Sequence, residues 1–101
     1  MLTPKIALPV DQIATFCCKW RITELSLFGS VLRDDFRPDS DVDVLVSFAA
    51  DTHWSLYDWV EMQAELKSML GREVDLVDKQ ALSNPFRRHA ILITRQVIYA
   101  A

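Results

Sequence analysis

Apolar residues change their spacing repeatedly along the chain, and this change constrains the fold more than any other feature. In some segments they recur every three or four positions, and in the segments between them they recur every second position. The first spacing is typical of helices packed on a core, and the second is typical of half-buried strands. Helices are predicted at residues 10–20, 54–70 and 85–93, and strands at residues 24–28, 41–48, 73–77 and 97–99. This alternation predicts an α/β fold in which helices pack against a small mixed β-sheet.

Turn and capping residues support these boundaries. The chain contains only two glycines, so each is expected to mark a junction. Gly71 follows residues 54–70, where a glycine commonly ends a helix, and Ser55 and Asp58 resemble a capping pair at the start of that segment. Gly29 follows the first predicted strand and indicates a tight turn there.

Length and charge limit the possible functions. The chain has 101 residues, of which 50% are hydrophobic. This is the size of one typical domain, so we expect a single domain over residues 1–101 and no separate domain for a second substrate. The net charge of −3 argues against a protein that binds nucleic acid through a surplus of cations.

The cysteines and the N-terminal residues indicate a cytoplasmic protein. Cys17 and Cys18 are adjacent, which fits neither a disulfide framework nor a zinc or redox motif. Pro4 and Pro9 interrupt the apolar residues at the N-terminus, so no signal peptide is expected. No apolar run approaches the roughly 18–20 residues of a membrane span. We therefore expect free thiols, a cytoplasmic location and no membrane contact.

Gly29 and Ser30 are candidates for holding a phosphate. They follow a predicted strand and precede a short helical segment, where backbone N–H groups and a hydroxyl are available to an anion. A glycine there allows the phosphate to approach the main chain closely. The alternative is an ordinary turn at the end of a strand.

Asp41 and Asp43 are candidates for metal ligands. They are two residues apart on a predicted strand, so both carboxylates leave the same face, about 7 Å apart at the backbone. Two like charges beside an apolar run are costly unless a cation offsets them. The alternative is a solvent-exposed strand start whose acids face water.

Asp75 is the candidate for a third carboxylate. It lies between Val74 and Leu76 on the next predicted strand, where an acid among apolar neighbours requires a partner. Glu73 and Asp78 remain alternatives for the same role. Three hard oxygen ligands on adjacent strands suit Mg²⁺ or Mn²⁺ and not zinc, and two such ions can clamp the oxygens of a phosphoryl transfer.

Together these residues carry a recognisable pattern. Gly29-Ser30 is followed after ten residues by Asp41-x-Asp43, with Arg33 three residues after Ser30 and Ser40 directly before the first acid. The pattern resembles the signature of the DNA polymerase β-like nucleotidyltransferase superfamily. The Phe-Gly-Ser-x-x-Arg variant, the short chain and the Val-Asp-Leu-Val segment resemble in particular the minimal nucleotidyltransferases (MNT), the MntA-type antitoxins paired with HEPN toxins.

The resemblance implies a nucleotidyltransferase fold and a two-metal site with ATP as co-substrate. Gly29 and Ser30 would contact the β- and γ-phosphates of ATP. Asp41 and Asp43 would bind both Mg²⁺ ions, with Mn²⁺ as the alternative. Asp75 would bind the catalytic metal and help to deprotonate the acceptor hydroxyl.

Two further residues of the pattern keep alternative roles. Arg33 would contact a phosphate or pair with a nearby acid, and Asp34, Asp35 and Asp39 all lie close to it in the sequence. Ser40 would cap or orient the loop that carries the first metal ligand.

The activity implied by the resemblance is transfer of AMP from ATP to a tyrosine of a HEPN ribonuclease toxin, which silences the toxin in a type VII-like toxin–antitoxin system. Without a domain that orients the acceptor, a partner protein must dock and supply it. One alternative is an antitoxin that neutralises its partner by binding alone. Another is a transferase that adenylylates a small molecule such as an aminoglycoside.

The last predicted helix carries a basic cluster of Arg87, Arg88 and His89. An exposed polar helix face is the favoured interpretation, because runs of charge are usually solvated. Contact with the nucleotide or with an acidic partner surface is the alternative. The long helix is predicted to bury one apolar stripe at three- and four-residue spacing, made of Leu56, Trp59, Met62, Leu66, Met69 and Leu70. Of the nearby tryptophans, Trp59 is therefore predicted to be core, and Trp54 is predicted to be exposed and a candidate for a partner interface.

Overall fold

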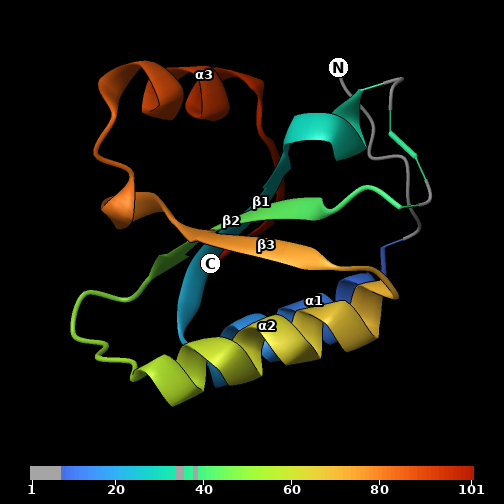
Figure 1. Ribbon diagram of the computed structural model, residues 1–101. Helices are drawn as coiled ribbons and strands as arrows, with labels where there is room; N and C mark the ends of the chain where they lie inside the picture. Colours follow the sequence, from blue (N-terminus) through green and yellow to red (C-terminus); the bar gives the residue numbers. More distant parts are fainter. Residues whose placement is uncertain (1–7, 34–35, 38) are drawn as a thin grey trace.

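The alternation of helices and strands is present in the computed structural model, which describes residues 8–33, 36–37 and 39–101 (Figure 1). The predicted α/β class with a mixed sheet is confirmed. In chain order the elements are α1 (Val10–Lys19), β1 (Ile22–Phe28), the 3₁₀ turn η1 (Gly29–Leu32), β2 (Val42–Phe48), α2 (Leu56–Leu70), β3 (Val74–Asp78), the 3₁₀ turn η2 (Lys79–Ala81), α3 (Pro85–Thr94) and β4 (Gln96–Ala100).

The four strands form one sheet with the order β3-β2-β1-β4. β1 runs antiparallel to both β2 and β4, whereas β2 and β3 are parallel. A parallel pair requires a crossover connection, and α2 supplies it (Figure 1). β2 and β1 are therefore the interior strands, and β2 has a neighbour on each side.

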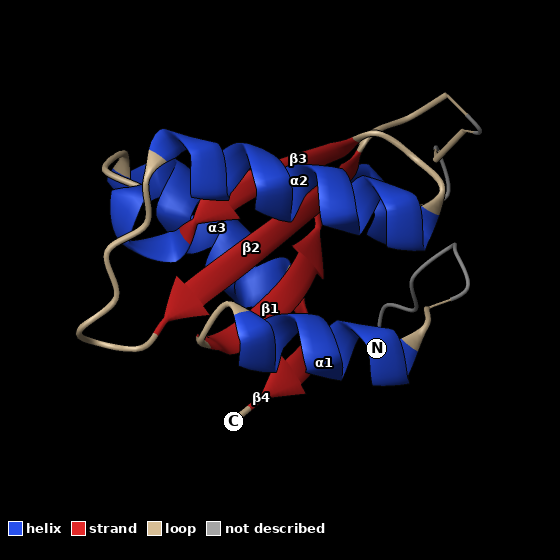
Figure 2. Cartoon of the chain, turned by 90° about the horizontal axis from the view of Figure 1, so that it is seen from below, coloured by secondary structure: helices blue, strands red, loops and turns tan. Residues whose placement is uncertain are grey.

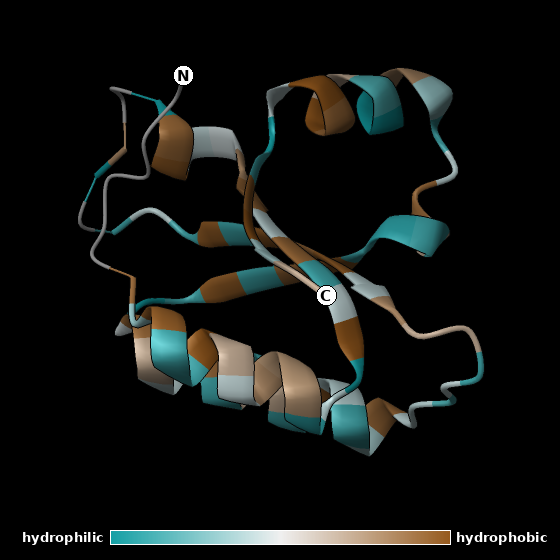
Figure 3. Cartoon of the chain, turned by 180° about the vertical axis from the view of Figure 1, so that it is seen from behind, coloured by the Kyte–Doolittle hydropathy of each residue, from teal (hydrophilic) through white to brown (hydrophobic). Residues whose placement is uncertain are grey.

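The two faces of the sheet are covered differently. α1 and α2 lie against one face, and η1 and α3 lie on the other (Figures 1 and 2). The strands alternate between hydrophobic and hydrophilic segments, as Figure 3 shows. The larger hydrophobic cluster joins α1 and α2 to the sheet, with Met62 and Val44 fully buried in it. A smaller cluster beneath α3 consists of Phe28, Leu45, Leu82 and Ile91.

The predicted helix ends are largely confirmed. Ser55 and Asp58 form a complete capping box, in which each side chain accepts from the backbone N–H of the other residue. Gly71 ends α2 in the left-handed conformation with φ 68°. Asn84 caps α3, and its side chain accepts from two backbone N–H groups of the first turn.

Two expectations about apolar residues near α2 are wrong. Leu56 was expected in the buried stripe of the helix but is 79% exposed, because α2 begins there and its first turn extends beyond the sheet. Trp54 is not exposed. Its ring lies edge-on to Trp20 at a centroid distance of 5.2 Å and also contacts Phe48, so it closes one end of the larger core.

The two cysteines are free thiols, as predicted, but their surroundings differ. Cys17 is buried in the larger core, and burial raises the pKa of its thiol to about 12. Cys18, the next residue of α1, faces outward and its sulfur lies 3.8 Å from the hydroxyl of Tyr99. In the described part of the chain, no helix has the length and apolar character needed to cross a membrane.

This difference predicts selective thiol labelling. At pH 8 a water-soluble disulfide reagent should modify Cys18 rapidly and leave Cys17 unmodified until denaturant is added, because only the thiolate reacts and Cys17 is buried and neutral. Release of the reagent's chromophore measures this. The Cys18→Ser variant should lose the fast phase, and a fast phase that persists in this variant would contradict the assignment.

Candidate functional site

Strand register brings two of the predicted acids together. Asp43 of β2 is the direct register partner of Asp75 of β3. Side chains alternate along a strand, so Asp43 shares a face with Leu45, which belongs to the cluster beneath α3. Asp41 precedes β2 by one residue and is exposed. The acids therefore lie on the α3 side of the sheet, away from the larger core.

Gly29 forms the opposite wall of this site. It begins η1 with φ +76°, a conformation that residues with a side chain rarely adopt. A Cβ atom added to Gly29 would overlap Oδ2 of Asp43. The carboxylate of Asp43 thus occupies the space that any other residue at position 29 would need, and the turn and the acid are adjacent.

The electrostatics confirm that the acids are close together. Burial raises the pKa of Asp43, and the charges of Asp75 and then Asp41 raise it further. The guanidinium groups of Arg33 and Arg87 act in the opposite direction. Asp43 therefore lies in a half-buried position with an excess of negative charge, where a cation would be favoured.

The two alternatives to Asp75 are engaged elsewhere. Glu73 forms an ion pair with Lys67 at the end of α2. Asp78 accepts a hydrogen bond of 2.9 Å from the backbone N–H of Gln80 and so caps η2. Asp75 is exposed next to Asp43, and it is the acid of β3 best placed to act with it.

The other residues of the pattern surround this centre. Ser30 follows Gly29 in η1, and its carbonyl accepts from the backbone N–H of Arg33 at 2.9 Å. Ser40 closes a turn before β2: its hydroxyl accepts from the N–H of Arg37 at 3.0 Å, and its own N–H donates to the Arg37 carbonyl at 3.0 Å. This geometry is that of a loop cap.

Arg33 was expected to contact a phosphate or to pair with a nearby acid. Two of the candidate acids, Asp34 and Asp35, lie outside the described residues. Arg33 itself is exposed and lines a groove beside Gly29. Its effect on the pKa of Asp43 places it near the acids as well.

The chemistry of the three acids suits a hard divalent cation. Their oxygens are the donors that Mg²⁺ and Mn²⁺ prefer. Among residues 8–33, 36–37 and 39–101, no three acidic, histidine or cysteine side chains already stand around a common metal position. Coordination would therefore require the carboxylates of Asp41 and Asp75 to turn toward that of Asp43.

A groove of about 340 Å³ extends from the site between η1 and α3. The groove is lined by residues from the end of β1, from η1 and the residue after it, and from α3. They are Phe28, Gly29, Leu32, Arg33, Arg87, Ala90, Ile91 and Thr94. Arg87 is exposed, as the favoured interpretation of the basic cluster predicts, and it also lines this groove. No local pattern in the sequence indicates that α3 and η1 lie on the same face of the sheet (Figure 1).

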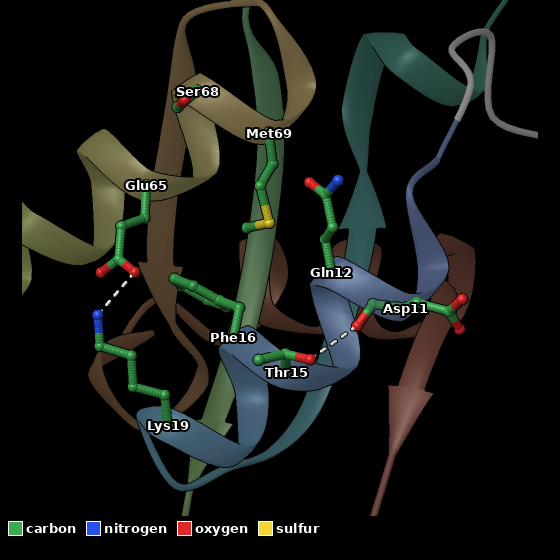
Figure 4. Close-up of a pocket in the computed structure, with 8 residues that line it drawn as sticks. All are labelled: Asp11, Gln12, Thr15, Phe16, Lys19, Glu65, Ser68 and Met69. Atoms are coloured by element: carbon green, nitrogen blue, oxygen red, sulfur yellow. Dashed lines mark hydrogen bonds and ion pairs between the residues drawn. The ribbon is translucent and has the colours of Figure 1, made fainter.

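A larger groove of about 450 Å³ lies on the other side of the sheet, between α1 and α2 (Figure 4). Phe16 and Met69 form its apolar part. At its edge the Lys19 ammonium lies 2.9 Å from Oε1 of Glu65, and the other oxygen of Glu65 accepts from the indole N–H of Trp20. Lys19 and Glu65 therefore have partners within the fold. The sheet separates this groove from Asp43 and Asp75.

Known proteins are similar to this chain in sequence and in architecture. The family model described as a nucleotidyltransferase domain matches residues 10–98. Protein adenylyltransferase MntA of Thermococcus cleftensis is 35% identical over 81 residues, which are 80% of this chain and 77% of that protein.

Two solved structures extend the comparison. A crystal structure of a toxin–antitoxin with AMP-PNP aligns with a TM-score of 0.72 and 25% identity, covering 93% of this chain and 75% of the other. A structure of the tri-AMPylated Shewanella oneidensis HEPN toxin in complex with MNT antitoxin aligns with a TM-score of 0.64 and 26% identity, covering 91% and 70%. The match over residues 10–98 confirms the predicted family: the chain belongs to the nucleotidyltransferase domain family.

Proposed function

We propose that this protein is an antitoxin that transfers AMP from ATP to a tyrosine of a HEPN toxin. The observation that carries the proposal is the contact of Asp43 with the backbone of Gly29, with Asp75 as its register partner. This contact supports the proposal because it sets the turn that would bind the phosphates beside the acids that would bind the metal. The AMP-PNP complex and the AMPylated toxin among its structural neighbours support the same donor and the same kind of acceptor.

The residues fit a bound Mg²⁺. Asp41, Asp43 and Asp75 supply oxygen donors, and the raised pKa of Asp43 reflects burial and the mutual repulsion that a cation would relieve. When bound, Mg²⁺ would neutralise charge on the phosphates and lower the energy of the transition state. We assign these three acids as its ligands, with Mn²⁺ able to replace it.

The nucleotide is held by the turn. The backbone of Gly29 admits a phosphate closely because no side chain intervenes, and the hydroxyl of Ser30 donates to the β- or γ-phosphate. Ser40 holds the loop that leads into β2 and so positions Asp41. Arg33 adds a positive charge at the same edge.

The reaction is an in-line substitution at phosphorus. The acceptor hydroxyl oxygen forms a bond to the α-phosphorus of ATP while the bond from that phosphorus to the oxygen bridging it to the β-phosphorus breaks. The electron pair of the broken bond leaves with pyrophosphate, and the proton of the hydroxyl passes to the carboxylate of Asp75. The products are the AMP-protein and pyrophosphate.

The acceptor is supplied by a docked partner. The described residues form one sheet with its covering helices, and among them there is no additional domain that could hold an acceptor (Figure 1). A HEPN toxin bound beside the site would present its tyrosine and raise the effective concentration of the hydroxyl. Because ATP is the donor, we place the reaction in the cytoplasm.

Replacing Asp43 by Asn should abolish transfer. The chain, a HEPN protein encoded beside it, labelled ATP and Mg²⁺ should give a labelled partner tyrosine, and Asp43→Asn should lower the rate at least about 100-fold because a charged metal ligand is lost. The matched control is Asp51→Asn, which removes a 77% exposed carboxylate paired with Arg21. Equal labelling by Asp43→Asn and wild type would contradict the assignment.

The same variant separates modification from neutralisation by binding alone. Cells that express the toxin should survive with wild-type protein and die with Asp43→Asn, although the variant still co-purifies with the toxin. Survival with Asp43→Asn would favour the binding-only antitoxin. Labelling of an aminoglycoside in place of the partner would favour the small-molecule transferase.

The two glycines offer a second matched pair. Gly29→Ala should cost about 1–2 kcal/mol of stability through its positive φ and should also displace the Asp43 carboxylate, lowering the transfer rate about tenfold or more. Gly71→Ala has a similar φ of +68° but meets nothing within 4 Å. It should therefore lose stability alone. Chemical denaturation and the labelling assay measure both effects, and equal activity of the two variants would show that the Gly29 contact is not functional.

A further inference from the structure

The groove between η1 and α3 contains one cation that the proposed function does not yet use. We propose that Arg87 binds the β- and γ-phosphates of the donor nucleotide across this groove, opposite Gly29. The proposal rests on the proposed function. It adds a nucleotide-binding residue from α3, which comes after Gly29, Asp43 and Asp75 in the chain.

The fold of α3 directs Arg87 toward the groove. Asn84 accepts hydrogen bonds from the backbone N–H groups of Phe86 and Arg87, which holds the first turn of the helix in place. Ile91, one turn after Arg87, is buried against the sheet. Residues four apart share a helix face, so Arg87 starts from the same side of α3 as this anchor.

The guanidinium of Arg87 is available for a ligand. Within the described part of the chain, Arg87 forms no ion pair and its side chain donates no hydrogen bond. The other arginines of this region differ. Arg88 donates to the carbonyl of Lys79 at 2.6 Å, and Arg95 lies 3.4 Å from the carboxylate of Glu24.

Arg87 is also close to the reacting centre. It lines the same groove as Gly29 and Arg33, and its charge lowers the pKa of Asp43 against the larger effect of burial. Two guanidinium groups therefore border the turn that is assigned to the phosphates. Arg33 directly follows η1 and Arg87 lies in α3, so the two cations come from separate parts of the chain. Together they give the groove a positive border beside Gly29.

The chemistry of this border matches a polyphosphate. A guanidinium donates two parallel hydrogen bonds to phosphate oxygens, which an ammonium cannot do. Phe28, Leu32 and Ile91 form a buried apolar floor, whereas Arg33 and Arg87 remain exposed and accessible to a nucleotide that enters from solvent. AMP has no β- or γ-phosphate, so the contact should distinguish ATP from AMP.

Equilibrium binding in the absence of a partner tests this assignment. With Mg²⁺ present, Arg87→Ala should weaken binding of AMP-PNP about ten- to hundredfold, as expected for loss of charge-assisted hydrogen bonds. Binding of AMP should change less than about threefold. Arg87→Lys should recover only part of the loss, because it keeps the charge but not the paired donors.

A control variant removes the same charge elsewhere. Lys19→Ala deletes a cation from the face covered by α1 and α2 and should leave both affinities unchanged. Unfolding curves of the four proteins check that each is folded under the binding conditions.

The outcomes separate this inference from the proposed function. If wild type binds AMP-PNP and Arg87→Ala binds it equally well, the role of Arg87 is overturned while the proposed function stands. If Arg87→Ala loses affinity for AMP as strongly as for AMP-PNP, the contact with the β- and γ-phosphates is also overturned. If wild type binds neither nucleotide, the proposed function fails and this assignment fails with it.

Discussion

The carboxylate of Asp43 lies where a side chain of residue 29 would be, and the arrangement of the whole site depends on this contact. A glycine is required there for two reasons, since the backbone has φ +76° and the carboxylate fills the space beside it. The contact joins the end of β1 to the beginning of β2 and therefore links the turn proposed to bind phosphate to the acids proposed to bind metal. Burial and repulsion at Asp43 are the energetic cost of this closeness, and nearby cations offset part of it.

One strand holds the site and both hydrophobic clusters together. β2 lies between β1 and β3, and its side chains alternate between the two faces of the sheet. Val44 and Val46 enter the larger core, Leu45 enters the smaller one, and Asp43 points to the site. Because the strand is anchored on both faces, it has little freedom to move, and it can hold an acid at the rigid point that a positioned reaction requires.

The charges of the molecule are arranged around this point. The net charge is −3, and three of the acids, Asp41, Asp43 and Asp75, lie near the start of the adjacent strands β2 and β3. Arg33 and Arg87 line the groove beside Gly29, and their charges lower the pKa of Asp43. A site with acids for a cation on one side and guanidinium groups for an anion on the other suits a complex of a divalent metal with a nucleotide.

By itself the sequence determined the elements, the helix caps and the residues of the Gly29–Asp43 pattern, because period, capping and motif spacing are local properties. It left the third acid open among Asp75, Glu73 and Asp78, expected Leu56 to be buried and Trp54 to be exposed, and placed Arg87 on an exposed helix face without indicating the groove that it lines. The tertiary structure decided these points. The parallel register of β2 and β3 pairs Asp75 with Asp43, Leu56 is 79% exposed at the start of α2, and α3 lies on the same face of the sheet as η1, so that the exposed Arg87 lines the groove beside Gly29. Each depends on contacts between residues far apart in the chain, which no local pattern encodes.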